Sequence, residues 1–363
     1  MGGEISGNLQ DNQRSSAIEI VSRRIGPGQP CFIIAEAGVN HNGDLGLAKR
    51  LVDAAVEARA DAVKFQTFRA QGVISRSAPK AAYQRETTDA AESQLDMARR
   101  LQLAPEAFRE LAAHCQRRGI LFLSTPFDEE SAALLAELGV PAFKIASGEV
   151  TNLPLVEHIA RKGKPVLLST GMSTLDEVAE AVEAIRRAGN DRLALLHCVS
   201  NYPADPPDAN LRAMRTLADA FGVPVGYSDH TLGIEVALAA VALGACVLEK
   251  HLTLDTALPG PDHRASLAPE QFAALVGGVR VIESAFGSGR KEPAPSERAV
   301  AAVARRSLVA ARDIEAGITV TEELIVAKRP GTGLAPSLRS ELVGKRAKVD
   351  IPEDTLLTWE MFE

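Results

Sequence analysis

The sequence of 363 residues lacks the features of membrane-spanning, secreted and disulfide-rich proteins. No apolar run approaches the roughly 20 residues of a membrane helix, and the polar stretch 1–16 has no apolar signal-peptide core. The four cysteines show no CxxC or zinc-ligand spacing, so we expect buried, reduced thiols. The net charge of −7 gives no reason to expect nucleic-acid binding. We therefore expect a cytoplasmic protein without membrane or nucleic-acid partners, in which local basic residues would hold any anionic substrate.

Short apolar runs recur through the first three quarters of the chain, and each is followed by a stretch with helical spacing. The eight runs cover residues 31–36, 61–66, 120–124, 142–147, 165–169, 192–198, 224–228 and 245–250. The principal helical stretches cover residues 45–59, 105–118, 129–138, 153–162, 175–188, 209–221, 232–243 and 269–285. Continuous apolar strands that alternate with helices are typical of parallel sheets, and this number of strands predicts an α/β fold of the (β/α)8 TIM-barrel type. A doubly wound sheet would have fewer strands or a Gly-rich phosphate turn, and neither is present.

Composition divides the chain into four parts. Residues 1–29 are expected to form a loose N-terminal tail that can contain one short hairpin, and residues 30–286 form the predicted barrel. Residues 287–300 are rich in Gly, Pro and charge, as in a linker. Residues 301–363 contain short strand-like pieces and turns, which predict a small β-rich domain that packs on something else. The longest loop, 69–103, follows the second strand and is expected on the functional face of the barrel.

Two histidines end neighbouring strands of one predicted βαβ unit. His230 closes the segment Gly-Tyr-Ser-Asp-His, and His251 closes Leu-Glu-Lys-His. Because parallel strands bring their carboxyl ends to one edge of the sheet, two imidazoles placed there can share a divalent metal. The alternative is that they are polar residues of unrelated loops.

Other polar side chains gather at the predicted strand ends, where TIM barrels carry their chemistry. Lys64 and Lys144 lie inside apolar runs, where an unpaired ammonium is costly, so each is expected to have an anionic partner. The alternative to a bound anion is a lysine–carboxylate pair that stabilises the barrel. Lysines with small hydroxyls suit a phosphate and a carboxylate, while Glu36 and Glu149 can act as acid and base or offset positive charge. These residues predict a carbonyl substrate on a metal, beside a phosphorylated acid.

At these positions the chain resembles the sialic acid synthase family, which condenses phosphoenolpyruvate with a six-carbon N-acyl sugar. The resemblance covers residues 31–363. It is carried by several motifs in order, among them Ile34-Ala-Glu-Ala-Gly-Val-Asn-His-Asn-Gly43, Lys144-Ile-Ala-Ser-Gly-Glu149, Gly226-Tyr-Ser-Asp-His-Thr231, Leu248-Glu-Lys-His251 and Lys328-Arg-Pro-Gly-Thr-Gly333. The last motif is similar to the family's antifreeze-like SAF domain.

The resemblance implies a role for each matching residue. His230 and His251 would hold Mn²⁺ or Mg²⁺ at the aldehyde oxygen of the open-chain sugar, and Glu36 and Glu149 would stabilise the cation formed at carbon 2 while water adds. The residues implied in substrate binding are Lys64, Gln66, Thr125, Lys144, Ser147, Ser169, Tyr202, Ser228, Asp262 and Arg329. Among them, Tyr202 and Asp262 would contact the sugar. Arg329 would reach the sugar's N-acyl group from the partner subunit in a domain-swapped homodimer.

Three alternatives remain. The sequence Val199-Ser-Asn-Tyr202, with Tyr83-Gln84 in the long loop, is closer to the bacterial legionaminate branch, so the sugar can be N-acetylmannosamine or 2,4-diacetamido-2,4,6-trideoxymannose. A metal-independent Schiff-base aldolase would use Lys144 or Lys250. A binding module on an inactive barrel would need no catalytic residues at all.

Overall fold

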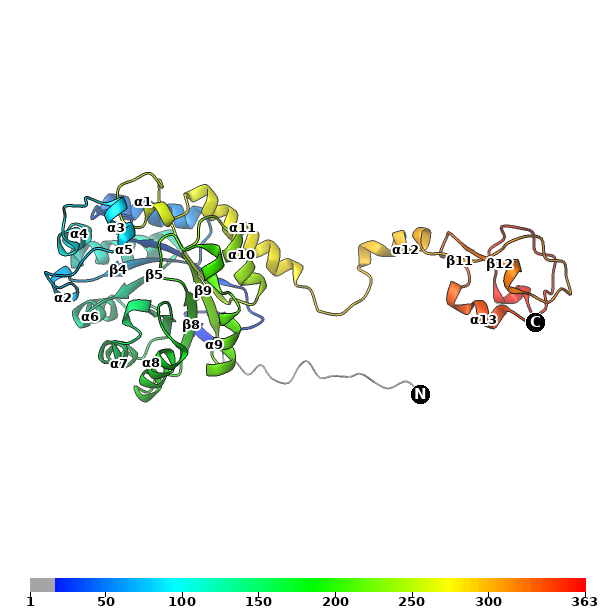
Figure 1. Ribbon diagram of the computed structural model, residues 1–363, viewed down its shortest axis with the longest axis horizontal. Coiled ribbons are helices and arrows are strands. Elements are labelled where there is room, and N and C mark those ends of the chain that lie inside the picture. Colours follow the sequence, from blue (N-terminus) through cyan, green and yellow to red (C-terminus); the bar gives the residue numbers. More distant parts are fainter. Residues whose placement is uncertain (1–16) are drawn as a thin grey trace. The chain divides into compact units, whose positions relative to one another are not determined.

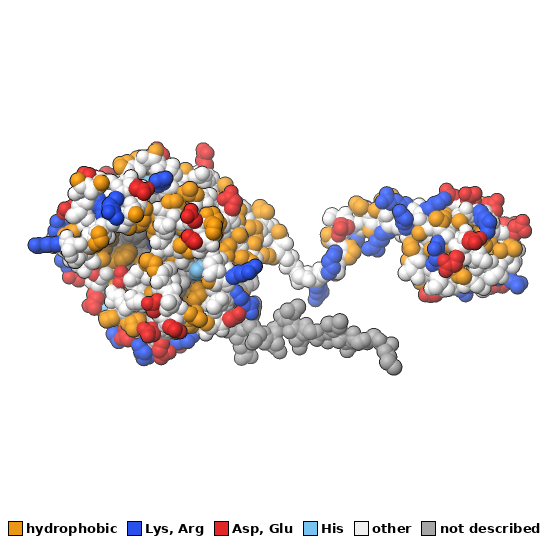
Figure 2. All heavy atoms as spheres, viewed as in Figure 1, with side chains coloured by type: hydrophobic (Ala, Val, Ile, Leu, Met, Phe, Trp, Pro, Cys, Tyr) orange, Lys and Arg blue, Asp and Glu red, His pale blue; other side chains and the backbone are white. Residues whose placement is uncertain are grey.

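The computed structural model describes residues 17–363 in two units, a larger one that ends at Phe286 and a smaller one, Gly287–Glu363. No helix within these residues is long and apolar enough to cross a membrane. The charged side chains of both signs are interspersed on the faces shown in Figure 2.

An eight-stranded parallel sheet forms the centre of the larger unit (Figure 1). Its strands are β3 (Phe32–Gly38), β4 (Ala62–Thr67), β5 (Leu121–Pro126), β6 (Phe143–Ile145), β7 (Val166–Ser169), β8 (Leu193–Cys198), β9 (Val225–Asp229) and β10 (Val247–His251). Hydrogen bonds join them in the order β5-β4-β3-β10-β9-β8-β7-β6, and β5 lies beside β6, which closes the barrel. Each strand overlaps one of the predicted apolar runs, so the TIM barrel predicted from the sequence is confirmed.

Helices surround the strands on the outside of the barrel (Figure 1). They are α1 (Leu45–Glu57), α5 (Pro105–Arg118), α6 (Glu129–Glu137), α7 (Leu153–Ala160), α8 (Leu175–Arg187), α9 (Ala213–Phe221), α10 (Glu235–Ala242) and α11 (Pro269–Ala285). Local sequence sets several of their ends. Thr174 and Glu177 form a capping box at α8, and Gly119 ends α5 with a φ of 75°, a conformation that residues with a Cβ adopt only with strain.

Two apolar layers hold the barrel together. One lies between strands and helices, and the other fills the interior at the amino ends of the strands, with residues such as Phe32, Ala62 and Val247. A short antiparallel hairpin, β1 (Ile18–Ile20) and β2 (Arg23–Ile25), adds its isoleucines to the interior layer. The hairpin expected within residues 1–29 therefore exists, and it covers the amino end of the barrel; residues 1–16 lie outside the described part.

The long loop after β4 contains three short helices. They are α2 (Ala70–Val73), α3 (Ala82–Thr87) and α4 (Gln94–Leu101). We call residues 69–103, the range of this loop, the insertion.

The smaller unit has an apolar core of its own, with members such as Leu308, Ile314 and Phe362. Strands β11 (Ser307–Ala310) and β12 (Ile325–Lys328) pair antiparallel, and isolated bridges join later segments. A helix, α12 (Arg298–Ala304), precedes β11 and straddles the predicted end of the linker at residue 300. The last helix is α13 (Arg339–Leu342).

Candidate active site

The alternation of side chains along a β-strand explains how polar groups reach the barrel interior. On β3, Phe32 and Ile34 belong to the interior apolar layer, and Glu36, two residues further on, lines a cavity. On β10, Val247 belongs to the same layer, and Glu249 and His251 line the cavity. Apolar residues therefore fill the amino half of the barrel and polar residues its carboxyl half.

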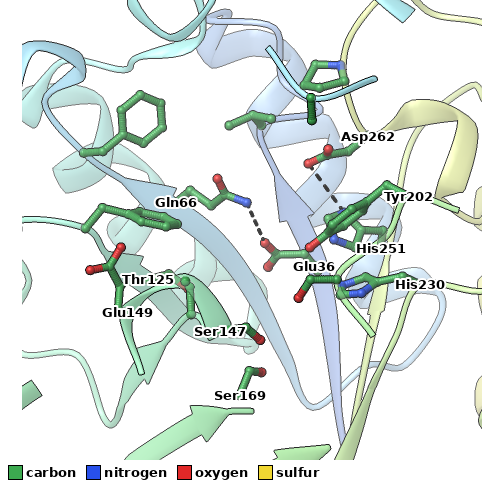
Figure 3. Close-up of a pocket in the computed structure, with 18 of the residues that line it drawn as sticks. Glu36, Gln66, Thr125, Ser147, Glu149, Ser169, Tyr202, His230, His251 and Asp262 are labelled. Carbon is green, nitrogen blue, oxygen red and sulfur yellow. Dashed lines mark hydrogen bonds and ion pairs between the residues drawn. The ribbon is translucent and has the colours of Figure 1, made fainter. Parts of the chain in front are cut away.

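This cavity has a volume of about 500 Å³. Every barrel residue predicted to take part in catalysis or binding lines it, namely Glu36, Lys64, Gln66, Thr125, Lys144, Ser147, Glu149, Ser169, Tyr202, Ser228, His230, His251 and Asp262. Figure 3 shows Glu149 and Thr125 on one side and Tyr202, His230, His251 and Asp262 on the other. The remaining predicted residue, Arg329, follows β12 in the smaller unit, where its Nε donates to the carbonyl of Ala304.

Two lysines and two glutamates form a buried charge cluster in the cavity wall. Lys64 Nζ lies 2.6 Å from Glu36 Oε2 and 3.8 Å from Glu249 Oε2. Lys144 Nζ lies 3.4 Å from Glu249 Oε1. Each lysine thus has the anionic partner expected for a buried ammonium, and the partner belongs to the protein. These are the lysine–carboxylate pairs of the alternative interpretation, but they line the cavity.

Burial and mutual charge shift the pKa values of this cluster in different directions. Burial raises the pKa of Glu36 to about 7, although Lys64 opposes the shift. Burial also acts to raise the pKa of Glu249, but Lys144 and Lys64 outweigh it and lower that pKa. Burial lowers the pKa of Lys144 despite the charge of Glu249. Glu36 is consequently the carboxyl that can exchange a proton near neutral pH.

Small polar groups line the cavity near Lys144. Ser147 Oγ lies 3.0 Å from Cys198 Sγ and accepts a hydrogen bond from the backbone N–H of Gly171. Ser169 Oγ is buried, and no described residue hydrogen-bonds to it. Ser228 donates to Glu249 over 3.0 Å. The hydroxyl of Ser169 therefore remains available to a ligand.

The two histidine rings lie 5.4 Å apart and face the same cavity, so they do not belong to unrelated loops. His230 donates from Nδ1 to the carbonyl of Val199 over 2.6 Å, which leaves Nε2 with its lone pair. Burial lowers the pKa of His230 to about 4, and burial also lowers the pKa of His251, with a further contribution from the neighbouring His230 and lysines. Both imidazoles are therefore neutral at neutral pH, as metal ligands must be.

The surroundings of the histidines fit a divalent cation. His251 Nδ1 is buried without a hydrogen-bond partner in the described chain, and the nearest carboxylate, Asp262, is 3.9 Å away. The bond from His230 to a backbone carbonyl is the usual way in which a metal-binding histidine is oriented. Residues 17–363 contain no group of three or more His, Cys, Asp or Glu side chains arranged around one metal position. Two protein ligands would leave the other positions to substrate and water.

The insertion lines another side of the cavity with uncharged residues. Its apolar lining residues are Val73, Ile74, Ala81, Met97, Ala98 and Leu101. Tyr83 and Gln84 of α3 line the same side, and the ring of Tyr83 lies 5.3 Å from that of Tyr202. The ring of Tyr202 in turn lies 4.1 Å from that of His230. We call Tyr83, Gln84 and these six apolar residues the insertion wall.

The sequence profile of the NeuB family matches residues 51–291, and that of the SAF domain matches residues 305–363. The chain belongs to the NeuB family. It is 48% identical over 342 residues to the N,N'-diacetyllegionaminic acid synthase of Legionella pneumophila, a match that covers 93% of this chain and 96% of the relative. It is 50% identical over 328 residues to the Campylobacter jejuni protein of the same name, over 90% of this chain and 98% of the relative.

A solved structure agrees with these matches. The N-acetylneuraminic acid (sialic acid) synthetase of Leptospira borgpetersenii, crystallised with citrate, superposes with a TM-score of 0.69 at 38% identity, over 79% of this chain and 95% of that one. The family predicted from the sequence motifs is thus confirmed.

The site of this NeuB chain contains one central residue to which sequence reasoning gave no role. This residue is Glu249 of β10, whose contacts with Lys64, Lys144 and Ser228 reach three other strands. The sequence does contain a signal for this residue. Glu249 precedes His251 by two residues, so both side chains point to the same side of β10.

Lys250, a lysine of the Schiff-base alternative, points away from the cavity. Its side chain is fully buried, and its ammonium donates to Asp229 Oδ2 over 2.6 Å and to the carbonyl of Thr231. Lys144 does line the cavity, next to Glu249. In this NeuB chain, Lys250 is a structural residue between β10 and β9.

Proposed function

We propose that the protein condenses phosphoenolpyruvate with the aldehyde of an open-chain N-acyl hexosamine, adds water and releases phosphate. The product would be a nonulosonic acid of the sialic acid type. The observation that carries the proposal is the buried cluster of Lys64, Lys144, Glu36 and Glu249 in one cavity with two neutral histidines. Membership of the NeuB family supports it.

Lys64 and Lys144 bind the phosphate and carboxylate of phosphoenolpyruvate, with Ser147, Ser169, Ser228 and Thr125 as hydroxyl donors. Gln66, which donates to Glu36 over 3.3 Å, orients that carboxyl. Because Lys64 and Lys144 are already paired with carboxylates, an incoming anion competes with Glu36 and Glu249 for them.

Glu36 and Glu149 act when positive charge develops at carbon 2. A carboxylate near that carbon stabilises the charge, and the second can accept a proton from the attacking water. Glu149 lies in a short 3-10 turn after β6, where it accepts a hydrogen bond from Asn152. Its position across the cavity from the histidines lets the two glutamates act on different sides of the substrate.

His230 and His251 would hold Mn²⁺ or Mg²⁺. When bound, such a cation supplies Lewis-acid polarisation of the aldehyde oxygen. Asp262 and Tyr202, beside the histidines, orient the sugar hydroxyls. Burial raises the pKa of Asp262 to about 6.

Between the two sugars considered above, the insertion wall favours 2,4-diacetamido-2,4,6-trideoxymannose. Its residues are apolar or neutral, and none of the cavity-lining residues described in the insertion is a lysine or arginine. A 6-deoxy carbon suits such an apolar wall better than the hydroxymethyl group of N-acetylmannosamine does. The identity of about 50% to N,N'-diacetyllegionaminic acid synthases supports the same sugar.

The second part of the proposal concerns assembly. Arg329 is exposed on the smaller unit, which contains the SAF domain and is called the SAF unit below. We infer that it reaches the N-acyl group of the sugar in the barrel of a partner subunit. A symmetric dimer that exchanges SAF units would complete both sites at once.

Phosphate release tests the reaction directly. The purified protein, Mn²⁺ and phosphoenolpyruvate are incubated with N-acetylmannosamine, N-acetylmannosamine 6-phosphate or the diacetamido sugar. We expect turnover with the highest kcat/KM for the diacetamido sugar. Phosphate release with none of the three would overturn the proposal, and the same rate for all three would overturn the choice of sugar.

A further inference from the structure

Helix α3 presents two cavity residues, Tyr83 and Gln84, although none of its residues is buried. Short helices in proteins are normally held by packing of an apolar face. Helix α4 follows that rule, since it buries Leu95, Met97, Ala98 and Leu101. Apart from the contact of Tyr83 with Tyr202, the position of α3 therefore depends on polar contacts.

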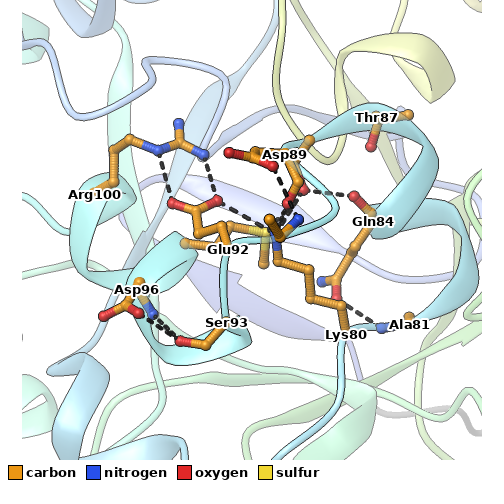
Figure 4. A network of polar contacts seen from close by, with 12 residues as sticks. Lys80, Ala81, Gln84, Thr87, Asp89, Glu92, Ser93, Asp96 and Arg100 are labelled. Atoms are coloured by element: carbon orange, nitrogen blue, oxygen red, sulfur yellow. Dashed lines mark hydrogen bonds and ion pairs between the residues drawn. The ribbon is translucent and has the colours of Figure 1, made fainter.

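Lys80, two residues before α3, supplies these contacts (Figure 4). Its side chain is only 3% exposed, and its ammonium donates to Thr88 Oγ1 over 3.0 Å and to the carbonyl of Asp89 over 2.7 Å. Thr88 Oγ1 in turn donates to the carbonyl of Gln84 over 2.6 Å. Lys80 thus joins the start of α3 to its end.

A third contact links this arrangement to α4. Lys80 Nζ lies 3.3 Å from Glu92 Oε2, and both oxygens of Glu92 accept hydrogen bonds from Arg100 of α4. Helix α4 is anchored by its buried side, so the chain of contacts Lys80–Glu92–Arg100 transfers that anchoring to α3. We call Lys80, Glu92 and Arg100 the insertion triad.

A buried ammonium is an expensive way to fill space, because an apolar residue of similar length would need no partner. The ammonium of Lys80 instead fixes geometry, because its three acceptors lie in definite directions and so define one position of the surrounding loop. Near the triad, Gln84 Oε1 accepts from the backbone N–H of Ala81, so its amide also has a defined orientation.

The two substrates depend on this arrangement to different degrees. Tyr83 contacts Tyr202, which packs on His230, so a displaced α3 alters the wall at the sugar end. Lys64 and Lys144 lie on β4 and β6 within the barrel, and hydrogen bonds of the sheet fix those strands. A change confined to α3 leaves them in place.

We propose that Lys80 is a positioning residue that sets the acceptor-sugar site by holding Tyr83 and Gln84, without acting on phosphoenolpyruvate. The proposal rests on the condensation proposed above.

The test is Lys80→Met, with Lys49→Met as the matched control. Lys49 is a half-exposed lysine of α1 that pairs with Glu110. In Lys80→Met we expect KM for the diacetamido sugar to rise about tenfold, while KM for phosphoenolpyruvate stays within about twofold of wild type. The control should change neither value. An equal rise in both KM values, or no rise in either, would overturn the assignment.

A second variant and a readout without turnover keep the test decisive. Glu92→Gln should reproduce the sugar-selective rise, and the double variant should be no worse than Lys80→Met, because both changes break one chain of contacts. Hydrogen exchange at residues 82–87 should become faster in Lys80→Met while exchange in β4 and β6 stays at the wild-type rate. If wild type releases no phosphate with any sugar, the condensation is wrong, and unchanged exchange at residues 82–87 would by itself refute the positioning role.

Discussion

Lys64 and Glu36 occupy opposite positions on neighbouring parallel strands, and their side chains form an ion pair of 2.6 Å in the cavity wall. The side chains of both residues are almost completely buried. Burial lowers the pKa of Lys64, but Glu249 and Glu36 raise it further than burial lowers it. Lys64 therefore stays charged, and the proton that can move within the cluster belongs to Glu36.

The raised pKa of Glu36 predicts a pH-dependent stability. The folded protein holds the proton of Glu36 more tightly than the unfolded chain does. The contribution of Glu36 to the free energy of unfolding is therefore fully present below pH 4.5 and is lost as pH rises to about 7. We expect the free energy of unfolding of wild type, relative to Glu36→Gln, to fall by about 3 kcal/mol across this window. Urea titrations followed by circular dichroism in metal-free buffer measure it. Glu183→Gln, an exposed control on α8, should show no such trend, and a pH-independent difference for Glu36→Gln would contradict the assignment.

Removal of either histidine should abolish condensation while the protein remains folded. In His230→Ala or His251→Ala one of the two proposed imidazole ligands is lost, and the loss of Lewis-acid activation should cost several kcal/mol of barrier. Mn²⁺ affinity can be measured by calorimetry and folding by circular dichroism. His114→Ala is the control, since His114 contacts Asp53 on the outside of the barrel. Wild-type turnover by either active-site variant in chelator-treated buffer would rule out the metal assignment.

Glu149→Gln and Lys64→Ala should have opposite kinetic effects. In the proposed mechanism the charge of Glu149 is needed when carbon 2 becomes positive, so its loss should reduce kcat far more than it raises KM for phosphoenolpyruvate. In the proposed mechanism Lys64 contacts an anion that is present from binding onward, so its loss should mainly raise that KM. Steady-state kinetics at saturating sugar separate the two effects. The same profile for both variants would show that the roles are wrongly divided.

Mixed dimers test the exchange of SAF units. Arg329→Ala and His251→Ala should each be nearly inactive alone. In a heterodimer, the intact barrel of the first variant can receive an intact arginine from the second, and activity should return to about half or less of wild type. Differently tagged subunits allow the heterodimer to be purified. Heterodimers as inactive as their parents would place the arginine's action within its own chain, or exclude it from catalysis.

The sequence predicts the barrel and most of its site because both follow from local regularities. Strand ends and the two-residue alternation bring Lys64, Lys144, His230 and His251 to one cavity. The end of β6 is less regular. The predicted strand ran to residue 147, but β6 ends at Ile145, and Ser147–Glu149 form a 3-10 turn that carries Glu149 across the cavity.

Contacts between distant segments could not be predicted from one sequence. Glu249 contacts residues on three other strands, and no local sequence pattern indicates which residues those are. Helix α3 is too short for a helical period, and it is held by Lys80 rather than by an apolar face. Pairs of this kind depend on tertiary geometry, which periodicity does not encode.

The isoleucines of the amino-terminal hairpin fill the barrel end remote from the cavity, and Arg23 ties the hairpin to Asp61 just before β4. The barrel is thus closed at the amino ends of its strands, and reactants must enter and leave at the carboxyl ends, through the opening of the cavity. A surface linkage attached ahead of Ala17 would hold the enzyme by its closed end and leave that opening facing the solution. Immobilised catalyst prepared in this way should keep the KM values of the free protein, whereas deletion of residues 18–25 should expose the apolar interior and promote aggregation.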